Sequence, residues 1–176
     1  MENNNGQKKK SRMESIVDTA GQMLLSLTGA PTDYLSGLRG VGILAARSYG
    51  ALAILPTGAF YGKCRNHCYK DRKVTDESPL SKKWLAEMKA FLSFQVPLYA
   101  TTLAMGSLAS HLGYHELKVD PEKILTGVGL LTLASPIAAP GTGLWMEAGR
   151  KIFGLDSAGK KARKSLEGEL IKSTTL

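Results

Sequence analysis

Three stretches of the chain, residues 48–62, 90–115 and 124–146, contain no Asp, Glu, Lys or Arg. About twenty consecutive apolar residues are enough for a helix to cross the roughly 30 Å hydrocarbon layer of a bilayer. A soluble helix as long as residues 90–115 would show a charged face, but this stretch offers only hydroxyl groups, one glutamine and histidines as polar side chains. The pattern therefore predicts transmembrane helices.

From these apolar runs we expect an all-α, polytopic membrane protein with four transmembrane helices in a domain over residues 13–153. The spans are expected at about residues 16–38, 40–61, 90–112 and 124–147. The first is the weakest, because Asp18 lies one turn inside it and Gly29-Ala30-Pro31 interrupts it; an amphipathic helix lying on the membrane surface is the alternative.

Five of the seven prolines lie in or against these spans: Pro31, Pro56, Pro97, Pro136 and Pro140. Each frees a backbone carbonyl, which can mark a bend or line a cavity. Broken helices of this kind are common at the substrate sites of transporters.

Local signals indicate where two of the helices begin. Ser78-Pro79 places Ser at the N-cap and Pro at the first helical position, and Asp120-Pro121-Glu122 adds an acid in the first turn. Residues 1–12 lack an apolar pattern and are expected to form a basic disordered arm. Residues 154–176 are expected to form a charged cytoplasmic tail with a short surface helix at 165–172.

Basic residues are unevenly divided between the two sides that four spans would create. Nineteen Lys and Arg fall within residues 1–12, 63–89 and 150–172, against four on the opposite side. Because cytoplasmic loops are enriched in Lys and Arg, both termini are expected in the cytoplasm. The net charge of +8 flanks apolar runs, which is typical of contact with membrane lipid and not of a nucleic-acid-binding face.

Ionisable residues in spans usually face a partner or a water-filled cavity, since each costs roughly 2.5–3.5 kcal/mol at the bilayer centre. The alternating direction of the spans places Asp33 and Arg47 together near the outer end. Four other polar residues are expected in the cytoplasmic third: Asp18, Arg65, Gln95 and Glu147. Both groups can be interpreted as plain ion pairs, or the inner group as a site for a small polar solute with one carboxylate free to titrate.

Gln95 and Tyr99 are four residues apart and therefore share one face of a helix. Pro97 lies between them and leaves the carbonyl of Ser93 without its usual donor. We expect the carbonyl, the amide and the phenol to converge on one small polar site at the depth of the inner group. The alternative is that Gln95 only bonds a neighbouring helix.

The sequence Phe94-Gln95-Val96-Pro97-Leu98-Tyr99 resembles the Phe-Gln-x-Pro-x-Tyr motif of the AlaE family, the small L-alanine exporters of bacteria. The block from Arg47 to Tyr61-Gly62, with Arg65 three residues later, is also similar, and the likeness runs from about Val17 to Phe153. Glu147 stands where the family usually has Asp. The resemblance implies four transmembrane helices in the inner membrane and efflux of an amino acid driven by an ion gradient, with protons as the expected ion.

Alanine is a zwitterion with one methyl group. Its site needs a cation for the carboxylate, either an anion or carbonyl groups for the ammonium, and a pocket too small for larger side chains. Arg65 can supply the cation, and Asp18 or Glu147 the anion. The residues expected to bind or transport the solute are Gln95, Pro97, Tyr99, Asp18, Arg65, Glu147, Arg47 and Tyr61.

Four helices enclose little room for a solute path, so we also expect a homodimer. Pairs of small residues four apart let helices approach closely, and the expected packing positions are Gly58, Gly62, Ala139 and Gly143.

A second hypothesis is a membrane scaffold whose basic 63–89 loop binds a cytoplasmic partner. The sequence shows no nucleophile together with a base and an orienting partner, so an enzyme is not expected. Cys64, His67 and Cys68 leave a zinc site one ligand short, and no metal or cofactor is expected.

Overall fold

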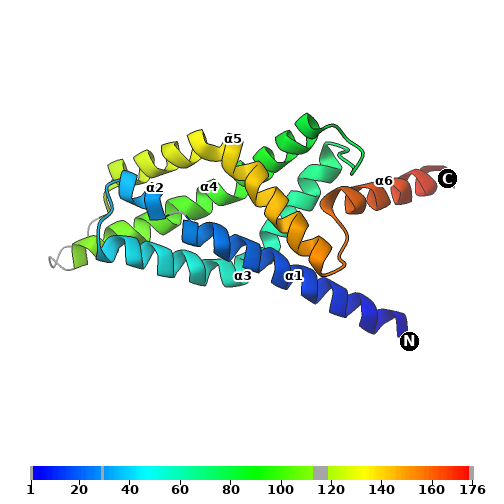
Figure 1. Ribbon diagram of the computed structural model, residues 1–176, viewed down its shortest axis with the longest axis horizontal. Coiled ribbons are helices and arrows are strands. Elements are labelled where there is room, and N and C mark those ends of the chain that lie inside the picture. The colour runs from blue at the N-terminus through cyan, green and yellow to red at the C-terminus, as the bar shows by residue number, and fades with distance from the viewer. Residues whose placement is uncertain (1, 29, 113–118, 175–176) are drawn as a thin grey trace.

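The computed structural model of the protein describes residues 2–28, 30–112 and 119–174, and Figure 1 gives its ribbon. The described residues form six helices and no strand, which confirms the all-α prediction. The helices are α1 (Glu2–Thr28), α2 (Ala30–Leu35), α3 (Val41–Asp71), α4 (Leu80–Leu112), α5 (Pro121–Ile152) and α6 (Ala158–Thr174).

The four long helices α1, α3, α4 and α5 form an elongated bundle (Figure 1). Helix α3 packs against both α1 and α4, and α5 packs against α4 and α1. The short α2 rests on α5 and α3, and α6 reaches back to α3. Both termini lie at the same end of the molecule as the α3–α4 connection, and α2 lies toward the other end (Figure 1). The basic segments therefore gather at one end of the bundle, as the distribution of charge predicted.

Of the helices that the structure describes, α3 and α5 are long and apolar enough to cross a membrane. Large apolar side chains are exposed along both: Leu44, Leu52, Leu55, Leu133 and Ile137. Helix α1 does not meet the same criterion, because its first half is polar. Helix α4, which holds the charge-free residues 90–112, also falls short, since its serines, threonines, Gln95 and Pro97 lower its mean hydropathy.

Several helix boundaries differ from the sequence-based expectation. Helix α1 begins at Glu2, so residues 2–12 are helical where a disordered arm was expected. The first span is divided into α1 and α2 around the predicted interruption, although Gly29 itself lies outside the described residues. Helix α3 continues to Asp71, and α6 is longer than the expected helix at 165–172. Each extension carries residues that contact distant parts of the chain, such as Lys10 with Asp156, Arg65 with Glu87, and Ala158 with Glu147. Such contacts are not visible in a local apolar pattern.

The predicted start of α5 is confirmed in detail. Asp120 is the N-cap and accepts a hydrogen bond from the backbone nitrogen of Glu122 at 3.2 Å, with Pro121 at the first helical position. Helix α4 begins at Leu80, one residue after the expected position, and the backbone nitrogen of Lys82 donates to the carbonyl of Pro79.

Helix α5 bends along its length (Figure 1) and contains two prolines, Pro136 and Pro140. Pro140 has no N–H to donate to the carbonyl four residues earlier, which is that of Pro136. The indole Nε1 of Trp84 on α4 donates to that carbonyl at 2.8 Å. The bend in α5 is therefore tied to the neighbouring helix by a side chain that replaces the lost backbone donor.

The small residues expected at a dimer interface pack inside the chain. A Cβ atom added at Gly58 would lie 2.7 Å from the Cα of Thr19, and one at Gly62 would lie 2.7 Å from the Cγ of Asp18, both on α1. A Cβ at Gly143 would lie 2.8 Å from Glu87 Oε2 on α4. Ala139 is fully buried. These positions do let helices approach closely, but the partner helices belong to the same chain, so a dimer would have to use another surface.

Candidate functional site

An ionic cluster joins α2, α3 and α4 at the end of the bundle away from the termini. Arg47 binds the carboxylate of Asp33 through two hydrogen bonds, Nε to Oδ2 at 2.6 Å and Nη2 to Oδ1 at 2.5 Å. Tyr99 donates its hydroxyl to Asp33 Oδ1 at 2.7 Å, and Arg47 Nη1 donates to the carbonyl of Ser26. The predicted proximity of Asp33 and Arg47 is confirmed, and all three guanidinium nitrogens of Arg47 have partners.

A second cluster joins α3, α4 and α5 toward the end of the bundle at which both termini lie. The Nε of Arg65 donates to both carboxylate oxygens of Glu87 at 2.8 and 2.9 Å, and its Nη2 donates to Glu87 Oε1 at 2.6 Å. The same Nη2 lies 2.8 Å from Glu147 Oε1, and Tyr69 donates its hydroxyl to Glu87 at 2.7 Å. The side chain of Arg65 is fully buried, whereas that of Glu147 is 30% exposed. The predicted meeting of Arg65 and Glu147 is therefore confirmed.

Asp18 was expected to lie with Arg65 and Glu147, but it belongs to a third cluster. Arg150 on α5 donates to it from Nε to Oδ1 at 3.1 Å and from Nη2 to Oδ2 at 2.9 Å. The remaining nitrogen of Arg150 donates to Asn66 Oδ1 at 3.2 Å. Asp18 and Arg150 are both buried.

The three clusters differ in their formal charge. Asp33 with Arg47, and Asp18 with Arg150, each balance one acid against one base. Arg65 alone faces two carboxylates, Glu87 and Glu147. A buried cation with two acidic partners leaves one negative charge in excess unless a proton or another cation is bound.

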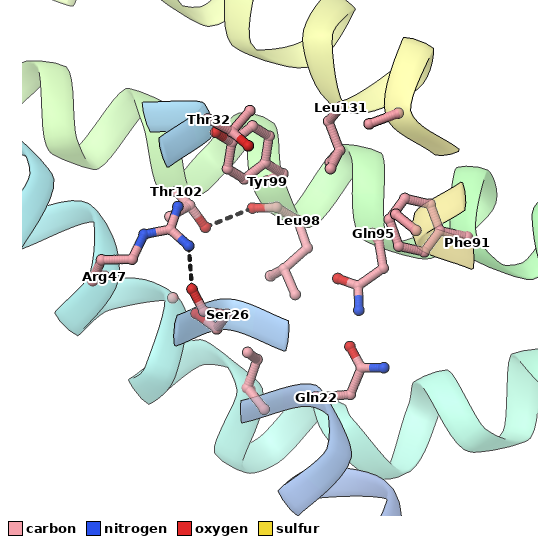
Figure 2. A pocket seen from close by; sticks show the side chains of 14 residues that line it. Gln22, Ser26, Thr32, Arg47, Phe91, Gln95, Leu98, Tyr99, Thr102 and Leu131 are labelled. Carbon is pink, nitrogen blue, oxygen red and sulfur yellow. Dashed lines mark hydrogen bonds between the residues drawn. The ribbon is translucent and has the colours of Figure 1, made fainter. Parts of the chain in front are cut away.

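Between the first cluster and the middle of the bundle lies a cavity of about 170 Å³. Helices α1 to α5 all contribute to its wall: Gln22, Ser26, Thr32, Arg47, Gly50, Ile54, Phe91, Gln95, Leu98, Tyr99, Thr102, Leu131, Ala134 and Ala138. Gln95 and Tyr99 line the same wall, as their spacing predicted. Figure 2 shows the side chain of Gln22 from α1 pointing toward that of Gln95 from α4.

The backbone contribution predicted beside Gln95 is not at the cavity. Pro97 and Ser93 are exposed on the outer side of α4, whereas Gln95 is buried. Because two residues correspond to about 200° of rotation in a helix of 3.6 residues per turn, the freed carbonyl lies on the face opposite the amide. The expected convergence of carbonyl, amide and phenol was therefore wrong. Tyr61 is buried with its ring 5.6 Å from that of Phe94, and its hydroxyl has no hydrogen-bond partner.

Sequence reasoning missed four residues of this arrangement: Gln22, Tyr69, Glu87 and Arg150. Gln22 follows Asp18 by four residues, so the helical spacing of buried polar residues on α1 could have indicated it. Glu87 and Tyr69 lie in the basic 63–89 segment, where charge suggested solvent exposure. No metal-binding group of His, Cys, Asp and Glu occurs within the described residues, and Cys64 and Cys68 are free thiols.

The tail helix is attached to the second cluster. Glu147 Oε1 accepts a hydrogen bond from the backbone nitrogen of Ala158, at the start of α6, at 3.0 Å. Just before α6, hydrogen bonds from Lys164, and then from Lys160 and Lys10, hold the pKa of the Asp156 carboxyl well below its usual range. The tail therefore contacts both the N-terminal helix and the acid that shares Arg65.

Comparison with known proteins identifies one family. The family model described as AlaE, L-alanine exporter, matches residues 8–156, which include all three ionic clusters and the cavity. No curated protein and no solved structure matches the chain. The matched segment covers most of the sequence, and it includes the motif from Phe94 to Tyr99 on which the sequence resemblance was based. The chain therefore belongs to the AlaE family of L-alanine exporters and is a membrane protein.

Proposed function

We propose that this protein exports L-alanine, or an amino acid of similar size, across the cytoplasmic membrane as a secondary transporter coupled to the proton gradient. Membership of an exporter family supports the direction and the class of solute. The single structural observation that carries the proposal is the cavity that all the long bundle helices line.

The size of the cavity suits a small amino acid. An apolar protein cavity of about 150 Å³ holds benzene, which has six non-hydrogen atoms, and L-alanine also has six. The cavity here is about 170 Å³, and Gly50, Ala134 and Ala138 form part of its wall. A larger side chain on the solute would have to displace helix backbone or the apolar side chains opposite, so the cavity favours glycine, alanine and serine over leucine.

The proposed topology has four spans with both termini in the cytoplasm. The first span is α1 together with α2, and the others are α3, the second half of α4, and α5. The location of both termini and the basic α3–α4 connection at one end of the bundle supports this orientation (Figure 1). In this arrangement the second and third ionic clusters lie toward the cytoplasm, and the cavity lies between them and the outer cluster.

The charge imbalance around Arg65 supports coupling to protons. With Glu87 and Glu147 both ionised the cluster carries one excess negative charge inside the bundle, which is costly in a membrane. Binding one proton makes the cluster neutral. Glu147 is the better candidate to exchange this proton with the surrounding water, because its side chain is 30% exposed whereas that of Glu87 is 5% exposed.

The scaffold hypothesis required a basic cytoplasmic loop over residues 63–89. Residues 63–71 and 80–89 belong to α3 and α4, and Arg65 is buried in an ion pair, which leaves a shorter connection over residues 72–79. A partner would therefore meet less of the basic segment than the sequence suggested. Self-association remains a proposal, through lipid-facing surface and not through the buried glycines.

Efflux from preloaded cells tests the function. Cells with and without the protein are loaded with radiolabelled glycine, L-alanine, L-serine or L-leucine, and the loss of each label is followed after dilution. The proposal predicts faster loss of L-alanine, and little change for L-leucine, when the protein is present. Equal rates for every amino acid in the two cell types would contradict it and would favour the scaffold.

A further inference from the structure

The cavity contains two buried polar atoms without a hydrogen-bond partner. They are the Oε1 of Gln22 and the Nε2 of Gln95. Both residues are more than nine-tenths buried, at 1% and 7% exposure. Leaving a buried amide group unpaired is unfavourable, and most buried polar groups in proteins are bonded. Two such atoms in one cavity therefore point to a ligand that bonds both.

The two unpartnered atoms have opposite hydrogen-bonding character. The Gln95 nitrogen is a donor and the Gln22 oxygen is an acceptor. The other end of the Gln22 amide, its Nε2, lies 4.0 Å from the sulfur of Met146, which directs the oxygen toward the cavity. Figure 2 shows the two amide groups pointing toward each other from α1 and α4, with the cavity around them.

Three other polar side chains of the wall, those of Arg47, Tyr99 and Thr102, are already engaged. Every guanidinium nitrogen of Arg47 bonds Asp33 or Ser26, and the Tyr99 hydroxyl bonds Asp33. Thr102 bonds the carbonyl of Leu98 in its own helix. The cavity therefore offers a ligand two neutral amide groups and no unpaired charge from Arg47, so a ligand with no net charge is favoured.

We propose that Gln22 and Gln95 bind the two charged groups of a zwitterionic amino acid, with Gln95 donating to the carboxylate and Gln22 accepting from the ammonium group. This inference rests on the proposed function and adds to it the residues that recognise the solute. The methyl group of alanine would face the apolar part of the wall, formed by Ile54, Phe91 and Leu131. In this proposal the solute is bound by the two glutamines and not by Arg65, whose guanidinium is held by two glutamates.

The proposal assigns a different chemical group of the solute to each glutamine, and analogues that lack one group separate the two roles. Propionate lacks the ammonium group of alanine, and ethylamine lacks the carboxylate. Wild-type protein should prefer alanine strongly over both. Gln22→Met should lose most of the preference over propionate, and Gln95→Met should lose most of the preference over ethylamine.

The experiment measures uptake of radiolabelled L-alanine into inside-out membrane vesicles, with each analogue as a competitor. Methionine has the length of glutamine without its amide, so the Met variants preserve packing, and Thr101→Val, on the exposed face of α4, is the matched control. Loss of one hydrogen bond to a charged group should raise the half-saturating alanine concentration roughly tenfold to a hundredfold. The Thr101→Val variant should behave as wild type.

The outcomes separate the two proposals. Wild-type vesicles that do not transport alanine would overturn the proposed function itself. Wild-type transport together with unchanged half-saturation and competition in both Met variants would overturn the glutamine assignment alone. If a Met variant is not recovered as a folded protein, Gln22→Glu is used in its place: a carboxylate facing the ammonium group should increase competition by ethylamine, and an unchanged competition profile would contradict the assignment.

Discussion

Replacement of Gly62 by alanine should destabilise the folded chain through the Asp18–Arg150 ion pair. The new Cβ atom would lie 2.7 Å from the Cγ of Asp18, and nearer still to its Oδ2. That oxygen accepts the hydrogen bond from Arg150 Nη2 at 2.9 Å, so the carboxylate would have to move away from its partner. The neighbouring backbone of α1 lies equally close at Gly58, so α1 cannot simply shift along α3.

The size of the effect follows from the burial of the pair. Separating a buried ion pair costs about 3–5 kcal/mol, and alanine in place of glycine in a helix returns roughly 1 kcal/mol at most. The net loss is therefore about 2–4 kcal/mol. At roughly 2–4 °C per kcal/mol for a chain of this size, the midpoint of thermal unfolding should fall by at least about 4 °C.

The assay is thermal unfolding of detergent-purified protein, followed by size-exclusion chromatography of the heated sample. Gly129→Ala is the matched control, because nothing lies within 4 Å of a Cβ added there, and it should be as stable as wild type or slightly more so. In an Asp18→Ala background, Gly62→Ala should have little further effect, since the clashing carboxylate is gone. Equal unfolding midpoints for wild type, Gly62→Ala and Gly129→Ala would refute this account of the packing.

Three further predictions concern topology, coupling and the outer cluster. With both native cysteines replaced by serine, Lys118→Cys should react with an impermeant thiol reagent in intact cells; reaction only after permeabilisation would reverse the proposed orientation. Glu147→Gln should fold, because Arg65 keeps its other acid, but alanine efflux should no longer respond to an imposed pH gradient; an undiminished response would exclude this residue as the proton carrier. Tyr99→Phe removes a hydrogen bond to the buried Asp33 carboxylate and should lower stability by about 1.5–3 kcal/mol, and an unchanged unfolding midpoint would contradict a stabilising role for that bond.

Features set by local chemistry could be predicted from the sequence. The start of α5 follows from Asp120, Pro121 and Glu122, because an N-cap and a first-position proline act within one helical turn. The contact of Asp33 with Arg47 followed from the direction of neighbouring apolar segments, since few other charges lie at that depth. Both predictions needed only the spacing of residues along the chain.

Features that depend on how helices rotate against one another could not be predicted in this way. Spacing showed that Gly58 and Gly62 allow a close approach, but not that α1 of the same chain occupies that face. Glu87 was assigned to a solvated segment, because nothing local indicates that Arg65 and Tyr69 would surround it. The proposed role of Gln22 depends on its position opposite Gln95, which lies on another helix (Figure 2).

Transport by the purified protein shows whether this chain alone moves L-alanine across a membrane. Liposomes that contain the protein are loaded with unlabelled L-alanine and diluted into a trace of radiolabelled L-alanine. Exchange through the protein then concentrates the label inside the liposomes. The account predicts transient accumulation of label with internal L-alanine, much less with internal L-leucine, and a response to an imposed pH gradient. Accumulation no greater than in protein-free liposomes would contradict it.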